Sequence, residues 1–420
     1  MNPRILLIGT ADTKSPELTF LKERIVEAGG EVVFMDVGVL SRGELKAELT
    51  NEGVAAAAGA SLPEISALGD ENAAMAKMAE GAARLAARLA AEGRIDGMLA
   101  LGGTMGTDLA LDVASALPLG VPKFIVSTIA YSHLIPPQRV SPDLMMILWA
   151  GGLYGLNDIC RSSLAQAAGA AVGAARAARR PTPSRPLIGM TSLGTSCLRY
   201  MEPLLPALEA RGYDVAVFHT TGMGGRAFEA LAASGAFAAV MDFSLQELAN
   251  HCAGSIVNAG ADRLEAAGRR GVPQIVAPGA IDMIDFPAWS ENPWGGEARR
   301  YRAHNRLLAS VTATGEERRA VARRIAEKLA LAQGPTVYIL PRLGIEGWDR
   351  EGEPMHAPEA LAAFLDEARR QPIGAAKLIE IDAHINDAAF AQTALSVFDT
   401  WAREGIVPAG ALIDAVCRQA

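Results

Sequence analysis

A polar segment near the start of the chain, "GTADTKS" from Gly9 to Ser15, combines residue types that bind phosphate and magnesium. Asp12 offers a carboxylate oxygen, the ligand type that the hard cation Mg²⁺ prefers. Lys14 can neutralise a phosphate as a point charge, and Thr13 adds a hydroxyl donor. Two interpretations stay open: a phosphate and magnesium site, or a helix start that Asp12 or Ser15 caps while Lys14 is solvated.

A second segment, "GGTMGT", has the composition of a backbone anion site. It follows an apolar run and precedes a helical pattern, so free N–H groups and the positive end of the helix can face a ligand. It lacks the GxGxxG spacing of dinucleotide-binding loops, which argues against a nicotinamide-dependent dehydrogenase, and the chain has no Gly-Lys step for a P-loop. A turn that serves only packing is the alternative. The candidate residues are Gly102, Gly103, Thr104, Met105, Gly106 and Thr107.

The second half of the chain contains two comparable segments, "TSLGTSC" and "HTTGMGG". Cys197 lies near a predicted helix start, where the pKa of a thiol is usually lowered, and His219 could act as its base. A buried thiol that serves packing is the alternative. The glycine-rich corner after His219 suits a carboxylate or phosphate, with packing again as the other interpretation. The residues predicted for this second ligand are Gly194, Thr195, Ser196, Thr221, Gly222, Gly224 and Gly225.

Further acids and histidines follow in the last third of the chain. They are Asp282, Asp285, His304, Asn305, Asp382 and His384. These residue types suit acid–base or metal chemistry, but no metal-binding spacing links them. We expect them to be helix caps or hydrogen-bonded surface residues, with Asp282 and Asp285 on a loop that follows a strand.

The hydrophobic pattern around these segments predicts alternating strands and helices. Short apolar runs such as "RILLIG" are typical of strands buried on both faces, and they alternate with amphipathic helices. We expect the first helix to begin after Ser15 as its N-cap and to end at Gly29. The prolines between Arg179 and Pro186 cannot continue a helix and indicate a boundary. The sequence therefore predicts an α/β protein with two doubly wound (Rossmann-like) parallel-sheet domains, residues 1–180 and 187–420.

A short sequence echo agrees with two similar domains. "GVPKFIV", which begins at Gly120, reappears as "GVPQIV", which begins at Gly271, and each copy follows a predicted helix and opens a predicted strand. In open parallel sheets, ligands bind beyond the carboxyl ends of the strands at a switch point in strand order. The polar segments that follow strands are therefore the places where we expect ligands.

Bulk properties narrow the class of protein. The net charge of −8 gives no overall basic surface, which argues against nucleic acid as the main partner. Four scattered cysteines in 420 residues indicate a reduced, cytoplasmic protein. The N-terminal apolar run is too short for a signal peptide, and the glycine-interrupted stretch 144–156 is too short for a membrane helix.

In combination, several motifs resemble the ATP-binding domain family of the tomato mosaic virus resistance protein and its uncharacterised bacterial relatives. The motifs are "IGTADTK", "LGGTMGT", "FHTTGMGGRAFE", "NAGADRLEAAGRRGVPQIVAPGAIDMIDF", "YRAHN" and "EIDAHINDAAFA". The resemblance covers nearly the whole chain. It implies two Rossmann-like subdomains, a homodimer, and ATP with Mg²⁺ bound at the first subdomain.

By motif, the resemblance implies that Asp12, Thr13 and Lys14 contact the nucleotide, together with the backbone of Gly102 to Gly106. The segment Asp36 to Gly38 would lie near the ribose or base. Some relatives carry an appended barrel domain similar to phosphoenolpyruvate-using enzymes, which we expect here as a separate partner protein. Three functions remain open: an ATP-binding protein, an ATP-dependent enzyme acting on a small carboxylate in the second domain, and an interaction module with structural ATP.

Overall fold

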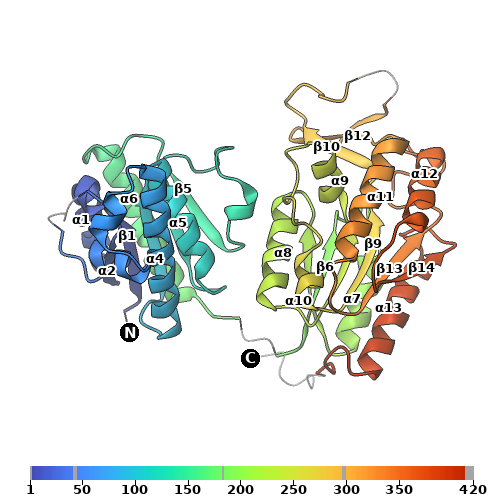
Figure 1. Ribbon diagram of the computed structural model, residues 1–420, viewed down its shortest axis with the longest axis horizontal. Helices are drawn as coiled ribbons and strands as arrows, with labels where there is room; N and C mark the ends of the chain where they lie inside the picture. Colours follow the sequence, from blue (N-terminus) through green and yellow to red (C-terminus); the bar gives the residue numbers. More distant parts are fainter. Residues whose placement is uncertain (1, 41–44, 182–183, 296–298, 412–420) are drawn as a thin grey trace. The chain divides into compact units, whose positions relative to one another are not determined.

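The computed structural model describes residues 2–40, 45–181, 184–295 and 299–411. The chain divides into two compact units, Met1–Thr182 (unit 1) and Pro183–Ala420 (unit 2). Each unit has a parallel sheet with helices on both faces, so the predicted α/β, Rossmann-like class is confirmed (Figure 1). A helix able to cross a membrane, by length and apolar character, does not occur in these described ranges.

Unit 1 is built on a sheet of five parallel strands in the order β2-β1-β3-β4-β5. The strands are β1 (Arg4–Gly9), β2 (Glu31–Asp36), β3 (Gly97–Gly102), β4 (Lys123–Ser127) and β5 (Leu144–Leu148). The central strand β3 is buried along its whole length, because helices cover both of its faces. The order reverses direction between β1 and β3, which makes their carboxyl ends the switch point of the sheet.

Two layers of helices cover this sheet. One apolar core joins one face to α2, α4 and α5, and another joins the opposite face to α1 and α6. The helices of unit 1 are α1 (Ala11–Glu27), α2 (Asn51–Ala57), α3 (Leu62–Ser66), α4 (Glu71–Ala91), α5 (Thr104–Ala116) and α6 (Asp158–Ala177), with a 3₁₀ turn at Pro137–Arg139. The carboxylate of Asp70 caps the start of α4, accepting from the amides of Asn72 and Ala73.

Unit 2 has a sheet of six parallel strands in the order β14-β13-β9-β8-β6-β7. The strands are β6 (Leu187–Ser192), β7 (Asp214–His219), β8 (Ala239–Ser244), β9 (Gln274–Gly279), β13 (Thr336–Pro341) and β14 (Lys377–Ile381). A small antiparallel sheet of β10 (Met283–Pro287), β12 (Leu308–Thr312) and β11 (Tyr301–Ala303) is inserted after β9. In Figure 1, β10 and β12 lie beyond one end of the parallel strands.

Helices also cover both faces of the unit 2 sheet. One apolar core includes residues of α7 and α13, and two others include residues of α8 to α12. These helices are α7 (Met201–Ala210), α8 (Met223–Ser234), α9 (Gln246–Cys252), α10 (Ala266–Arg270), α11 (Gly315–Leu329), α12 (Pro358–Arg370) and α13 (Ala388–Arg403).

The two sheets have the same topology. Read from its other edge, the order β7-β6-β8-β9-β13 of unit 2 repeats the order β2-β1-β3-β4-β5 of unit 1, and β14 extends it. The sequence echo falls on equivalent strands, since the first copy leads into β4 and the second into β9. Gly120 and Gly271, which open the copies, have φ angles of 84° and 77°, a conformation that favours glycine. The topology therefore supports the duplication that the echo indicates.

The first helix begins earlier than expected. α1 starts at Ala11 rather than after Ser15, and its backbone leaves the helical conformation only at Lys14. Ser15 is not the N-cap, because its hydroxyl donates to the carbonyl oxygen of Ala11. The cap is instead the carboxylate of Asp36, which accepts from the amide of Ala11 at 3.0 Å. The expected end is confirmed, since Gly29 with φ of 78° follows the last turn.

Candidate functional site

The start of α5 in unit 1 leaves a row of backbone amides open. Within the described residues, no acceptor is found for the amides of Gly103, Thr104, Met105 or Gly106. The first amide of this turn with a partner belongs to Thr107, which donates to the carbonyl oxygen of Gly103. The helix is 13 residues long and follows β3 at the switch point, so these amides and the helix dipole favour an anion there.

Gly102 and Gly103 are glycines for different physical reasons. A Cβ on Gly102 would lie 2.5 Å from the Cα of Gly106, so Gly102 is required by packing. A Cβ on Gly103 would meet nothing closer than the Oγ1 of Thr128 at 3.8 Å, and its φ of −73° suits any residue. Packing therefore does not explain Gly103. The open space in front of its backbone is what a close-approaching ligand needs.

The hydroxyl groups of this loop divide into internal and exposed ones. Thr107 is fully buried, and its Oγ1 lies 2.7 Å from the Oγ of Ser127 on the neighbouring strand. The Oγ of Ser127 in turn accepts from the amide of Ile129. Thr107 therefore fixes the loop to β4, whereas Thr104 and Met105 are exposed at its rim.

Asp12 stands beside the end of β2. Its Oδ2 accepts from the amide of Leu40 at 3.0 Å, while its Oδ1 is buried without a hydrogen-bond partner in the described residues. Gly38 makes this position possible, since a Cβ there would lie 2.6 Å from the Oδ2 of Asp12. The amide of Gly38 donates to Asp36, whose pKa is raised by burial.

Lys14 has internal contacts in this structure. Its Nζ donates to the carbonyl oxygen of Leu153 at 2.5 Å and lies 5.0 Å from the centre of the Tyr154 ring. Thr13 is exposed, and its Oγ1 lies 2.7 Å from the Oγ1 of Thr10. A ligand that uses Lys14 must therefore compete with one carbonyl group and one aromatic ring.

The glycine-rich corner of unit 2 already holds an anion from its own chain. The amides of Gly222 and Gly225 both donate to the Oε1 of Glu247, at 2.5 and 3.1 Å. A Cβ on Gly225 would lie 1.6 Å from the Oε2 of Glu247, and one on Gly224 would lie 1.8 Å from the carbonyl oxygen of His219. These glycines serve packing around a buried carboxylate. Their two amides are not available to an external anion.

Glu247 is part of a buried ion network. Its Oε2 accepts from the Nε of Arg263, whose guanidinium group also pairs with Asp242 and Glu229. Burial raises the pKa of Glu247 to about 7, and the charge of Arg263 acts in the opposite direction. Each carboxylate of this cluster has a protein partner, which is what a buried charge requires.

Cys197 is a buried thiol in this fold. It is 3% exposed, and its Sγ donates to the Oε2 of Glu346 at 3.2 Å. Burial raises the pKa of Cys197 well above its usual range, and the neighbouring charge of Glu346 adds to this. A nucleophilic cysteine needs the thiolate form. The arrangement therefore favours the packing interpretation of Cys197 over a Cys–His nucleophile.

A cavity of about 360 Å³ lies next to this thiol, at the carboxyl end of the unit 2 sheet. It brings together Ser196, Cys197, His219, Thr221, Asp285, His304 and Asn305, which sequence reasoning had singled out in separate segments. Thr195 is exposed next to it. A Cβ added to Gly194 would lie 3.9 Å from the Cε1 of the His219 ring. Burial and His304 both lower the pKa of His219.

Two further wall residues had no signal in the sequence. Gln246 follows β8, and Trp348 comes from the loop after β13. Asp285 was expected on a loop, but it lies within β10, where antiparallel pairing to Ser310 of β12 holds it. The inserted antiparallel sheet therefore forms part of the cavity wall, which local sequence patterns do not indicate.

A cluster of buried acids lies behind Cys197. Burial raises the pKa of Asp282 to about 7 and that of Glu346 to about 9, and the neighbouring charge of Asp282 raises the pKa of Glu346 further. His384 contacts Asp349 at 3.0 Å, whereas Asp382 is exposed and pairs with Arg342. In the described ranges, no three acids, histidines or cysteines are arranged to hold a metal ion.

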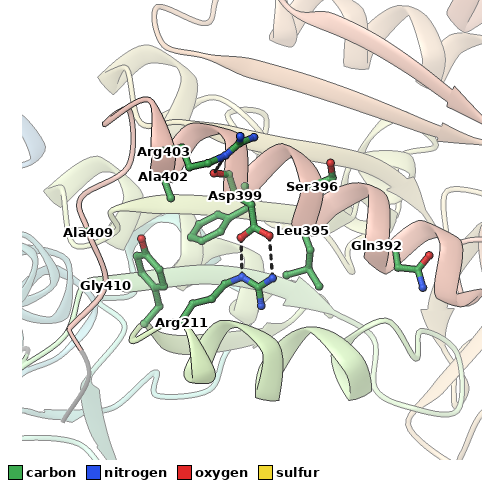
Figure 2. Close-up of a pocket in the computed structure, with 11 residues that line it drawn as sticks. Arg211, Gln392, Leu395, Ser396, Asp399, Ala402, Arg403, Ala409 and Gly410 are labelled. Carbon is green, nitrogen blue, oxygen red and sulfur yellow. Dashed lines mark hydrogen bonds and ion pairs between the residues drawn. The ribbon is translucent and has the colours of Figure 1, made fainter.

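A larger hollow, of about 880 Å³, lies near the opposite, amino end of β7 (Figure 2). Its two principal charges satisfy each other: the guanidinium group of Arg211 binds both carboxylate oxygens of Asp399, at 2.6 and 2.8 Å. Figure 2 shows the remaining polar side chains spread along α13 rather than converging. This groove therefore has no group poised for chemistry, and the smaller cavity is the candidate site of unit 2.

Comparison with family models matches most of the chain. The N-terminal domain of an uncharacterised protein family, UPF0261, matches residues 3–180, and the C-terminal domain of the same family matches residues 185–402. A UPF0261 protein of Brucella melitensis is 58% identical over 409 residues, which are 97% of this chain and 98% of that protein.

More distant relatives extend this similarity. A UPF0261 protein of Clostridium tetani is 35% identical over 394 residues, 93% of this chain and 97% of that protein. The ToMV susceptible protein tm-1(GCR26) of Solanum lycopersicum is 27% identical over 431 residues, which are 94% of this chain and 55% of that protein.

Proposed function

The chain belongs to the uncharacterised protein family UPF0261, and we propose that its unit 1 binds ATP together with Mg²⁺ at the start of α5. The phosphates lie against the backbone from Gly103 to Gly106. No reaction is assigned to the nucleotide. The motif resemblance to an ATP-binding family supports the identity of the ligand.

One observation carries this proposal: four consecutive amides at the switch point have no acceptor among the described residues. The first amides of a helix have no intrahelical acceptor, and at α5 no side chain caps them, so the row is open to water or to an anionic ligand. A phosphate group supplies several strong acceptor oxygens at once. In unit 2 the amides of Gly222 and Gly225 at the start of α8 are occupied by Glu247, whereas no side chain takes this place at the start of α5.

The residues of unit 1 fit a magnesium ion that comes with the nucleotide. Asp12 has one oxygen, Oδ1, that is buried and has no partner in the described residues, and Mg²⁺ is commonly held by one or two carboxylates plus phosphate oxygens. When bound there, the ion neutralises phosphate charge. Asp12 would be its protein ligand, and Lys14 would move from Leu153 to the phosphates.

The experiment is thermal unfolding of the whole chain with and without millimolar Mg-ATP. Ligands that bind only the folded state raise the unfolding temperature. Gly103→Ala adds a Cβ that the fold accommodates but that stands where the phosphate approaches, so we expect about a tenfold loss of affinity. Gly169→Ala is the matched control, because its Cβ on α6 meets nothing within 4 Å. An unshifted wild-type chain, or Gly103→Ala binding as wild type does, would overturn the proposal.

The resemblance also supports a cytoplasmic homodimer with a separate barrel-domain protein as partner. Light scattering coupled to size-exclusion chromatography tests the dimer: a mass of one chain, 44.0 kDa, at micromolar concentration would contradict it.

A further inference from the structure

The cavity of unit 2 contains a buried acceptor that the fold leaves unused. Gln246 is 2% exposed and lines the cavity, and its Oε1 has no hydrogen-bond partner in the described residues. A buried carbonyl oxygen without a donor is costly and uncommon in native folds. The position of Gln246 directly after β8, beside the switch point between β6 and β8, is where open α/β sheets bind ligands.

Asp285 is a second buried acceptor in the same cavity. It is 1% exposed; its Oδ1 accepts from the Oγ of Ser310 at 2.5 Å, its Oδ2 has a long contact of 3.5 Å with Asn250, and hydrogen bonding from the Gln246 side chain lowers its pKa. The amide of Asp285 donates to the Oδ1 of Asn250, which fixes the strand at this point. A ligand that reaches both acceptors would donate hydrogen bonds to them.

The residues that line the cavity also argue against an anionic ligand. Among the described residues that form it, none is lysine or arginine, so no fixed cation faces the space. Phosphates and polycarboxylates in protein sites are usually met by such cations. Burial and His304 lower the pKa of His219, which weakens its use as a cation near neutral pH. A polar but uncharged molecule fits this balance best.

The remaining wall residues fit hydroxyl groups and a flat apolar face. The hydroxyl groups of Ser196 and Thr221 can each both donate and accept, and the Nδ2 of Asn305 can donate, since its Oδ1 already accepts from two backbone amides. The backbone amides of Thr195 and Ser196 have no acceptor within the described chain, so the rim can also donate. The indole ring of Trp348, which is 9% exposed and has the guanidinium group of Arg302 stacked 3.9 Å from its centre, adds an apolar wall.

We propose that unit 2 contains a second ligand site, which takes an uncharged, polyhydroxylated small molecule of monosaccharide size. Its hydroxyl groups donate to the Oε1 of Gln246 and to the carboxyl group of Asp285. The size follows from the volume of about 360 Å³, at the small end of ligand cavities. The site is independent of the nucleotide site proposed for unit 1.

Saturation-transfer NMR on the whole chain tests this site with named probes. The neutral probes are D-ribose, D-xylose, D-glucose, D-galactose, ribitol and sorbitol, and the charged ones are D-ribonate, D-gluconate, D-ribose 5-phosphate and D-glucose 6-phosphate. We expect signal from at least one neutral probe and none from its charged counterpart. Silence from all the neutral probes, or signal from charged probes alone, would overturn the proposal.

Variants locate the signal. Gln246→Leu removes the acceptor at similar size, and we expect it to weaken binding of the neutral probe at least about tenfold. Gln392→Leu, the same change on α13 in the groove of Figure 2, is the control and should bind as wild type does. Asp285→Asn is the second variant, should Gln246→Leu fail to give a sharp thermal transition. Unchanged binding in a folded Gln246→Leu chain, or in Asp285→Asn where the first variant fails, would show that the site lies elsewhere.

Discussion

Gly38 and Asp12 lie so close that only a glycine leaves room for the carboxylate: a Cβ on Gly38 would stand 2.6 Å from the Oδ2 of Asp12. The carboxylate is held in this place by the amide of Leu40, and its other oxygen has no partner in the described part of the chain. The end of β2 therefore positions the one oxygen that we assign to the magnesium ion.

Gly38→Ala should separate magnesium binding from nucleotide binding. The added methyl group must displace the Asp12 side chain, which is flexible enough to move without unfolding unit 1. We expect ATP affinity measured by calorimetry to lose its dependence on Mg²⁺, with a change of about tenfold. Gly53→Ala is the control, because its Cβ would meet the Oγ1 of Thr50 at an ordinary 3.6 Å. A magnesium effect of wild-type size in Gly38→Ala would contradict the assignment of Asp12.

Lys14→Met should weaken Mg-ATP binding while stability changes little. The lysine gives up one carbonyl contact and one ring contact, which at a partly exposed site contribute at most about 1 kcal/mol. The loss of a phosphate contact should cost about tenfold in affinity. Lys77→Met, on the exposed face of α4, is the control. If Lys14→Met lowered the unfolding temperature and left the affinity intact, the lysine would have a structural role.

Gln246→Leu should make the free chain more stable although it removes ligand binding. The Oε1 of Gln246 is buried without a partner among the described residues, so its replacement by an apolar group of similar size removes a cost of about 1 to 3 kcal/mol. Urea unfolding followed by the near-UV signal of unit 2 measures the change. A clear loss of stability would show that the amide makes a structural contact.

Asp285→Asn should change how stability depends on pH. Burial raises the pKa of Asp285 from its ordinary 3.8 to about 6, against the lowering effects of Ser310, Asn250 and the facing His304. Between these values the folded chain keeps a proton that the unfolded chain has lost. The stability that this proton contributes is present below about pH 4 and is lost as the pH rises through about 6, in total about 3 kcal/mol.

Urea unfolding of wild type and Asp285→Asn at a series of pH values measures this effect. The difference in unfolding free energy between them should move in favour of the asparagine variant as the pH rises from about 4 to about 7. A constant difference across this range would mean that Asp285 titrates alike in the folded and unfolded chain.

The sequence predicts the fold well because its signals are local. Apolar runs with amphipathic helices between them are enough to indicate parallel sheets, and both units follow that pattern. The start of α1 was missed because its cap, Asp36, is 25 residues away on the next strand. The local signal of Ser15 before Pro16 pointed to a later start, and a distant carboxylate overrode it.

The candidate sites were predictable only in part. Strand-following polar segments led to Asp12, Gly103 and His219, because strand ends share one edge of a parallel sheet. Gln246 gave no signal, since one wall of its cavity comes from β10 and β12, which lie 37 or more residues later in the chain. The hydrogen bond from the amide of Gly222 to Glu247 could not be predicted either, because the two residues are 25 apart in the sequence.

Glu247 makes α8 insensitive to the ionic composition of its surroundings, because the chain supplies its own counter-charge to that helix start. Replacing it with alanine would leave a vacancy of the right shape for dissolved sulfate or phosphate, beside the guanidinium group of Arg263. The melting temperature of such a variant should rise with the concentration of these ions. The melting temperature of wild type should not depend on them. A glycine-rich helix start thus either binds an external anion or is occupied by a carboxylate of its own chain, and one distant side chain decides which.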